Sequence, residues 1–165
     1  MLIEIDTREK ERAIKKIKED FDRWGIQWYP QGLNAGDYRN LDNPRIIIDR
    51  KQNLSELCCN VVQQHDRFVR ELLRAKEHGF HMIILVEQGG KIKKLSDVGG
   101  WYNPRLRYSK CAVTGKRLYK ILKTMTEKYE FEIEFCDKKD TAKRIVELLA
   151  EEGFAWNNQP TVNEC

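Results

Sequence analysis

The sequence lacks several features that would place it in a specialised class of protein. Its five cysteines are an odd set without a CxxC pair, so they indicate neither a disulfide framework nor a cysteine-ligated metal site. The longest apolar run, residues 82–86, is far shorter than the roughly 20 residues of a membrane span. No secretory signal is recognisable at the start of the chain. We therefore expect a reduced, cytoplasmic protein without a membrane anchor.

A large excess of one charge is also absent, since 30 Lys and Arg residues face 26 Asp and Glu residues. A site for a polyanion must then arise from local clustering. Residues 88–115 are rich in glycine, aromatic and basic residues with little periodicity, which favours a long functional loop. Aromatic rings stack on unpaired bases and basic side chains bind phosphates, although the loop could instead fold onto its own core. The expected DNA contacts are Trp101, Tyr102, Arg105, Arg107, Lys110 and Lys116.

The apolar periodicity predicts alternating strands and helices within one domain over residues 1–152, followed by a C-terminal tail at 153–165. Strands are expected at 2–6, 26–29, 46–48, 82–86 and 131–135, the third of them as part of a hairpin. Helices are expected at 13–24, 118–125 and 142–149, and one long stripe of apolar positions covers 54–75. This pattern predicts an α/β protein with three α/β/α layers around a central mixed sheet.

Three charged residues form a candidate catalytic group around the hairpin. The period of two in a strand places Asp49 and Lys51 on one face, with Arg50 on the other. Asp37 follows a glycine one hairpin upstream and is the expected companion acid. Carboxylate oxygens suit Mg²⁺, which takes only one or two protein carboxylates and keeps several waters. An isolated D-x-K triplet is more often a surface ion pair, so the wider pattern matters.

That wider pattern resembles the nuclease domain of the XPF family, in its archaeal Hef-like form. The segments that carry the resemblance are IEIDTRE (3–9), GDY (36–38), IIIDRK (46–51), MIILVE (82–87) and CDKKDTAKRIVELL (136–149). The resemblance implies a restriction-endonuclease-like PD-(D/E)XK fold. It also implies an endonuclease that depends on Mg²⁺, which Mn²⁺ may replace, and that cuts branched DNA such as flaps, forks or junctions during repair or recombination. Members usually work as dimers through this domain, so a homodimer is expected.

The family signature also implies roles for individual residues. Asp37 and Asp49 would bind the metal, and Lys51 would serve the nucleophilic water. The signature has a glutamate where Asp49 stands and an aspartate where Ser55 stands. Either the neighbouring Glu56 substitutes for the second acid after a small shift, or that acid is absent. The implied catalytic residues are Asp6, Asp37, Asp49, Arg50 and Lys51, with Arg8, Glu9 and Glu56 as supporting candidates.

Two other functions fit the same sequence. A non-catalytic DNA-binding scaffold would keep the fold without cutting, and the change at Ser55 favours it mildly. A restriction-type nuclease would read a sequence in unbranched duplex, since the same fold supports that activity. The compact size suits a bacterial or phage protein.

Overall fold

The computed structural model describes residues 1–150, and the tail expected at 153–165 lies outside them. A six-stranded mixed sheet forms the centre, in the order β2-β1-β3-β4-β5-β6. β3 runs antiparallel to both of its neighbours, and the remaining neighbouring strands are parallel. The mixed sheet and the hairpin are therefore confirmed. The strands are β1 (Leu2–Asp6), β2 (Gln27–Gln31), β3 (Tyr38–Asn40), β4 (Ile46–Lys51), β5 (His81–Glu87) and β6 (Glu132–Cys136).

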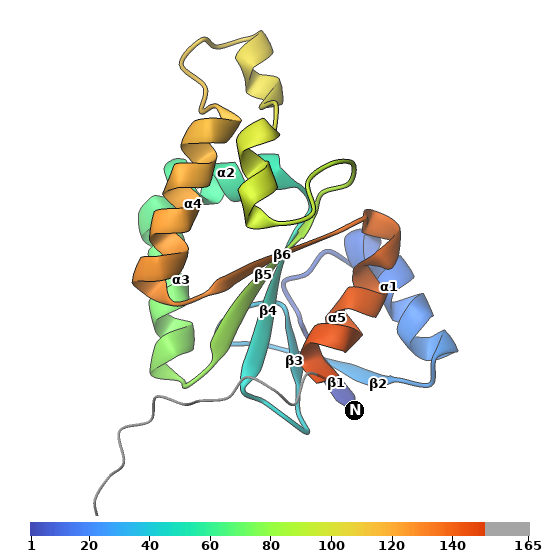
Figure 1. Cartoon of the computed structure of the whole chain (residues 1–165). Coiled ribbons are helices and arrows are strands. Elements are labelled where there is room, and N and C mark those ends of the chain that lie inside the picture. Colours follow the sequence, from blue (N-terminus) through green and yellow to red (C-terminus); the bar gives the residue numbers. More distant parts are fainter. Residues whose placement is uncertain (151–165) are drawn as a thin grey trace, which may run out of the picture.

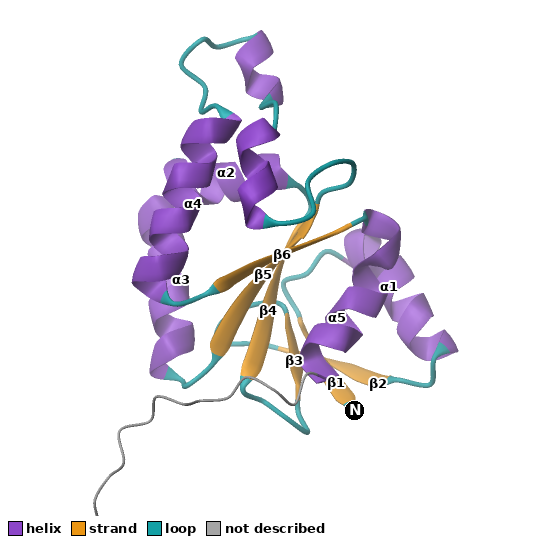
Figure 2. Ribbon diagram, viewed as in Figure 1, coloured by secondary structure: helices purple, strands orange, loops and turns teal. Residues whose placement is uncertain are grey.

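Helices cover both faces of the sheet, which confirms the three-layer prediction (Figures 1 and 2). One face carries α1 (Glu11–Arg23) and α5 (Thr141–Ala150). The other carries α2 (Leu54–Val62), α3 (His65–Glu77) and α4 (Gly115–Tyr129). Each face has its own cluster of buried apolar side chains. Within residues 1–150, no helix has the length and hydropathy needed to cross a membrane.

The alternation of side chains along β4 decides which residues share a face. Ile46 and Ile48 belong to the apolar cluster under α1 and α5, whereas Ile47 belongs to the cluster under α2, α3 and α4. All three are buried, so the register of the strand is fixed by packing on both sides. The polar residues at the end of the strand, Asp49, Arg50 and Lys51, continue this alternation. Asp49 consequently points to the α2 and α3 side, and Arg50 points to the opposite side.

The stripe over residues 54–75 forms two helices rather than one. α2 ends at Val62 and α3 begins at His65. The buried positions stop at Val61 and resume at Phe68, because Val62 is exposed and residues 63–67 are polar. A continuous helix would gain no packing there, so the chain turns and α3 takes a new direction.

The segment 88–115 is less irregular than its sequence suggests. It contains two 3-10 helices, η1 (Leu95–Gly100) and η2 (Pro104–Arg107). A third 3-10 helix, η3 (Lys138–Asp140), lies outside this segment and precedes α5. Val98 is fully buried, and half-buried Trp101 packs against the apolar cluster on the α4 side. Gly115 lies so close to this segment that a Cβ atom there would approach the Trp101 carbonyl oxygen to 2.3 Å. The base of the loop is thus packed onto the protein, and Figure 1 shows its outer part projecting beyond α4.

Candidate active site

Asp49 and Lys51 lie together at the end of β4, on the face that α2 and α3 cover. Lys51 Nζ is 2.8 Å from Asp49 Oδ1, and the two residues are only 8% and 3% exposed. The Lys51 ammonium also lies 5.9 Å from the centre of the Phe68 ring on α3. The prediction that strand geometry brings this acid and this ammonium together is confirmed.

Asp37 reaches the same place because of the glycine before it. Gly36 has φ = +66°, and a Cβ atom there would lie 2.7 Å from Ile47 Cγ1. Only glycine allows the chain to turn this close to β4. The Asp37 N–H then donates to the Ile48 carbonyl oxygen at 2.7 Å, which extends the pairing of β3 with β4. Asp37 therefore sits next to the strand that carries Asp49.

These side chains line a cavity of about 410 Å³ between the C-terminal end of β4 and α3. Acidic residues and basic residues both contribute to its wall, and α3 supplies four of them. The residues that line it are Arg8, Glu9, Asp37, Asp49, Arg50, Lys51, Glu56, Arg67, Arg70, Glu71 and Arg74.

The carboxylates that line the cavity act on one another and on Lys51. Burial raises the pKa of Asp37 well above the usual carboxyl range, and the charges of Asp49 and Glu9 raise it further. Burial alone would lower the pKa of Lys51, but the carboxylates of Asp49 and Asp37 outweigh burial and raise it. Lys51 is consequently an ammonium at neutral pH, and its charge is shared among several acids.

The donor set fits a hard divalent cation. Asp49 Oδ2 is buried and has no hydrogen-bond partner, which is costly unless something else binds it. Carboxylate oxygens are the ligands that Mg²⁺ and Mn²⁺ accept. Within residues 1–150, no three His, Cys, Asp or Glu side chains converge as a complete set of ligands. An ion here would be held by one or two carboxylates and would keep much of its hydration shell.

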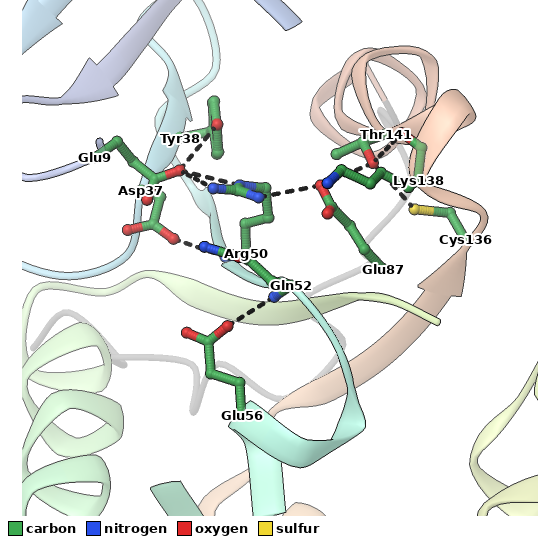
Figure 3. Close-up of polar contacts among 10 residues, drawn as sticks. All are labelled: Glu9, Asp37, Tyr38, Arg50, Gln52, Glu56, Glu87, Cys136, Lys138 and Thr141. Carbon is green, nitrogen blue, oxygen red and sulfur yellow. Dashed lines mark hydrogen bonds and ion pairs between the residues drawn. The ribbon is translucent and has the colours of Figure 1, made fainter. Parts of the chain in front are cut away.

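Arg50 lies on the opposite face of β4, in a buried polar network (Figure 3). Its guanidinium donates to Glu9 Oε2 at 2.7 Å and to Glu87 Oε1 at 3.1 Å. The Tyr38 hydroxyl donates to the same Glu9 oxygen, and the Thr141 hydroxyl donates to Glu87. The Arg50 side chain is therefore committed to two carboxylates, while its backbone N–H donates to Asp37 Oδ2 at 2.7 Å.

Asp6 and Arg8 pair with each other beside the cavity. The Arg8 guanidinium and backbone N–H both donate to the Asp6 carboxylate, whose side chain is fully buried. Asp6 is not among the residues that line the cavity, whereas Arg8 is. The Asp6 N–H also donates to the Asp37 carbonyl oxygen at 2.8 Å. The structure thus places Asp6 behind Asp37 as part of its support.

The remaining predicted residues fall into two places. Glu56 lines the cavity, but its Oε2 accepts from the Gln52 N–H at 2.8 Å at the start of α2. Ser55 instead lines a separate hollow of about 180 Å³, between α2 and the loop that carries Arg105. The basic and aromatic residues predicted to bind DNA surround that loop and α4, and all of them are exposed except half-buried Trp101.

The structure adds two acids to which no role was assigned from the sequence. Glu87 is the partner of Arg50 at the end of β5, and Glu71 faces the cavity from α3. A glutamate at the end of a fully buried strand signals a paired charge, which points to Glu87. Glu71 is adjacent to buried Leu72 in a helix of otherwise charged appearance, so its position could not be recognised without the orientation of α3.

Known proteins resemble this chain in sequence and in fold. A family model described as the ERCC4 domain matches residues 5–148. The solved structure of XPF from Aeropyrum pernix matches with a TM-score of 0.63, 23% identity and 90% coverage of this chain. The structure of XPF from Aeropyrum pernix in complex with DNA matches with the same TM-score and coverage and 24% identity. The chain spans 63% and 62% of those two chains. No curated protein matches at a significant level. The structural likeness confirms the restriction-endonuclease-like fold.

Proposed function

The chain belongs to the ERCC4 domain family, the XPF family of nuclease domains, and on this premise we propose that it is a divalent-metal-dependent DNA endonuclease. The observation that carries the proposal is the convergence of Asp37, Asp49 and Lys51 on one cavity. Asp49 Oδ2 is the buried oxygen there without a hydrogen-bond partner. A buried carboxylate oxygen without a hydrogen-bond partner is unfavourable for stability. A functional role, here metal binding, explains why it is present.

Asp37 and Asp49 would hold the metal, Mg²⁺ or Mn²⁺. When bound, such an ion supplies electrostatic stabilisation of the pentacoordinate transition state and activation of a water. Lys51 contributes a fixed positive charge, because the surrounding carboxylates keep its amine protonated. That ammonium can donate a hydrogen bond to a phosphate oxygen or orient a water. The expected products carry a 5′-phosphate and a 3′-hydroxyl.

The DNA strand would enter along α3. Arg67, Arg70 and Arg74 recur on the helix face that lines the cavity. Arg74 is held by the Asn34 carbonyl oxygen, whereas Arg67 and Arg70 form no ion pair within residues 1–150. Seven residues of helix span about 10 Å, which suits contact with neighbouring phosphates. The relative solved in complex with DNA supports a DNA substrate. The exposed residues Tyr102, Arg105, Arg107, Lys110 and Lys116 would contact a more distant part of it.

The finer parts of the proposal are the substrate and the assembly. We expect a preference for flaps, forks or junctions in repair or recombination, and a homodimer in solution. Both expectations derive from family membership. Light scattering during gel filtration measures the second of them directly.

The test is cleavage of a panel of labelled substrates: forked, flapped, four-way and plain duplex DNA, each with Mg²⁺, Mn²⁺ or EDTA. We expect cutting of branched substrates that requires the metal and that Asp37→Asn, Asp49→Asn and Lys51→Ala each abolish. The same variants should bind DNA with near-normal affinity. No product on any substrate would identify a scaffold, and fixed cuts in unbranched plasmid would identify a restriction-type enzyme.

A further inference from the structure

Glu71 is a half-buried acid that lines the same cavity as Asp37, Asp49 and Lys51. Its Oε1 accepts a hydrogen bond from the Gly36 N–H at 3.3 Å, so α3 is attached to the turn that carries Asp37. Within residues 1–150, Glu71 forms no ion pair with a Lys, Arg or His side chain. A partly buried carboxylate without a direct ion pair has unused capacity to accept hydrogen bonds.

Glu56 lines the cavity as well, but its carboxylate is occupied. Its Oε2 accepts from the Gln52 N–H (Figure 3). Its own N–H donates to Asn53 Oδ1 at 2.9 Å. These contacts fix the turn at the start of α2 and resemble a capping arrangement. Glu56 is half-buried, as Glu71 is. Two acids thus border one cavity, one engaged with its local backbone and the other facing the aspartates.

A second observation, independent of Glu71, points to a cation at this position. Asp49 Oδ2 is buried, aimed into the cavity side of β4 and without a hydrogen-bond partner. Glu71 and Asp49 line the same cavity. Burial raises the pKa of Glu71 and the charge of Asp49 raises it further, whereas the charges of Lys51 and Arg8 lower it. The cavity therefore has an acid on each side, Asp49 on β4 and Glu71 among the arginines of α3.

We propose that Glu71 is a third acid of the metal centre, which accepts hydrogen bonds from the hydration shell of an ion held by Asp37 and Asp49. This inference rests on the proposed function. The three carboxylates do not converge as direct ligands within residues 1–150, so the third acts one layer further out. Mg²⁺ retains several waters that need acceptors, and outer carboxylates commonly change metal affinity by about 10- to 100-fold.

Glu71 would alternatively be only an anchor between α3 and the Gly36 turn. Two substitutions separate these roles. Glu71→Gln keeps an oxygen that can accept from Gly36 but removes the charge. Glu71→Asp keeps the charge but is one methylene shorter and loses that hydrogen bond. A metal role predicts weaker metal binding in Glu71→Gln than in Glu71→Asp, and an anchoring role predicts the reverse order.

The experiment is calorimetric titration of Mg²⁺ and Mn²⁺ into the full chain without DNA. Glu77→Gln is the control, because it removes one charge from an exposed position of α3 outside the cavity. We expect Glu71→Gln to weaken metal binding about 10-fold or more, with Glu71→Asp intermediate and Glu77→Gln within about twofold of wild type.

The outcomes distinguish the role of Glu71 from the proposed nuclease function. Wild-type protein that binds metal while Glu71→Gln binds it equally well would overturn the role of Glu71 and leave the nuclease proposal standing. Wild-type protein that binds no metal would remove the nuclease proposal itself. Thermal unfolding in EDTA, followed for each variant, shows whether a loss of metal binding reflects a loss of fold. A variant that binds metal weakly while it unfolds at the wild-type temperature supports the inference.

Discussion

The backbone N–H of Arg50 donates to Asp37 Oδ2 at 2.7 Å, although the Arg50 side chain points away from Asp37 to the other face of the sheet. One residue thus joins the candidate metal site to the buried network of Glu9 and Glu87. Its backbone N–H holds the Asp37 carboxylate in place. Its guanidinium anchors this end of β4 to Glu9 and Glu87. The Arg50 backbone thus supports the site, while the charge of its guanidinium is paired with Glu9 and Glu87.

Arg50→Met should destabilise the protein strongly. Glu87 is 7% exposed and would lose its cation, and Glu9 would lose its strongest hydrogen bonds. An uncompensated buried charge costs about 3–5 kcal/mol, which urea unfolding would measure. The control is Glu87→Gln, which keeps an acceptor for Arg50 and Thr141 and should cost about 1 kcal/mol. Wild-type stability in Arg50→Met combined with lost cleavage would instead make Arg50 a direct participant in the reaction.

Gly36→Ala should lower both stability and cleavage. The substitution places a methyl group 2.7 Å from Ile47 Cγ1 and 3.0 Å from the Ile48 carbonyl oxygen, at a positive φ. The turn must shift and carry Asp37 with it, so cleavage should fall about 100-fold or more. Gly79→Ala is the matched control, because its φ of +73° is similar and nothing lies within 4 Å of the new methyl group. It should cost about 1 kcal/mol through backbone strain and leave cleavage intact.

The sequence allowed much of this site to be predicted, for a physical reason. Asp49 and Lys51 share a face because the strand period is two, and Gly36 precedes Asp37 because only glycine fits the turn. These are local rules. The break between α2 and α3 and the position of Glu71 depend on how α3 packs across the sheet, which no local pattern encodes. The packing of Trp101 onto the core is of the same kind, since a half-buried and a stacking tryptophan look alike in a sequence.

Magnesium should stabilise the wild-type protein against heat and should not stabilise Asp37→Asn. Binding to the folded state adds about 2.7 kcal/mol at a metal concentration of 100 times Kd. Asp37→Asn removes a ligand, and it also removes a charge that Asp49 and Glu9 repel. The metal-free variant should therefore be at least as stable as metal-free wild type. Scanning calorimetry with Mg²⁺ and with EDTA measures both effects, and an equal Mg²⁺ shift in the two proteins would exclude Asp37 as a ligand.

The two candidate DNA surfaces can be separated by their salt dependence. Arg67→Ala with Arg70→Ala removes two unpaired charges from the wall of the cavity, and Arg105→Ala with Arg107→Ala removes two from the projecting loop. Each phosphate contact contributes about 0.9 to the slope of log affinity against log salt. Loss of the α3 pair should lower the slope by about 2 and also slow cleavage, because the contact lies next to the reacting phosphate.

Loss of the loop pair should lower the slope by a similar amount while the rate at saturating DNA stays near that of wild type, because contacts far from the cavity add binding without positioning the reacting phosphate. Lys15→Ala with Lys16→Ala, two exposed positions on α1 across the sheet, controls for net charge and should change neither quantity. Fluorescence anisotropy in EDTA over a range of salt measures the slope, and single-turnover cleavage measures the rate. A wild-type slope in the α3 variant would place the DNA path elsewhere and leave the loop as its only candidate among residues 1–150.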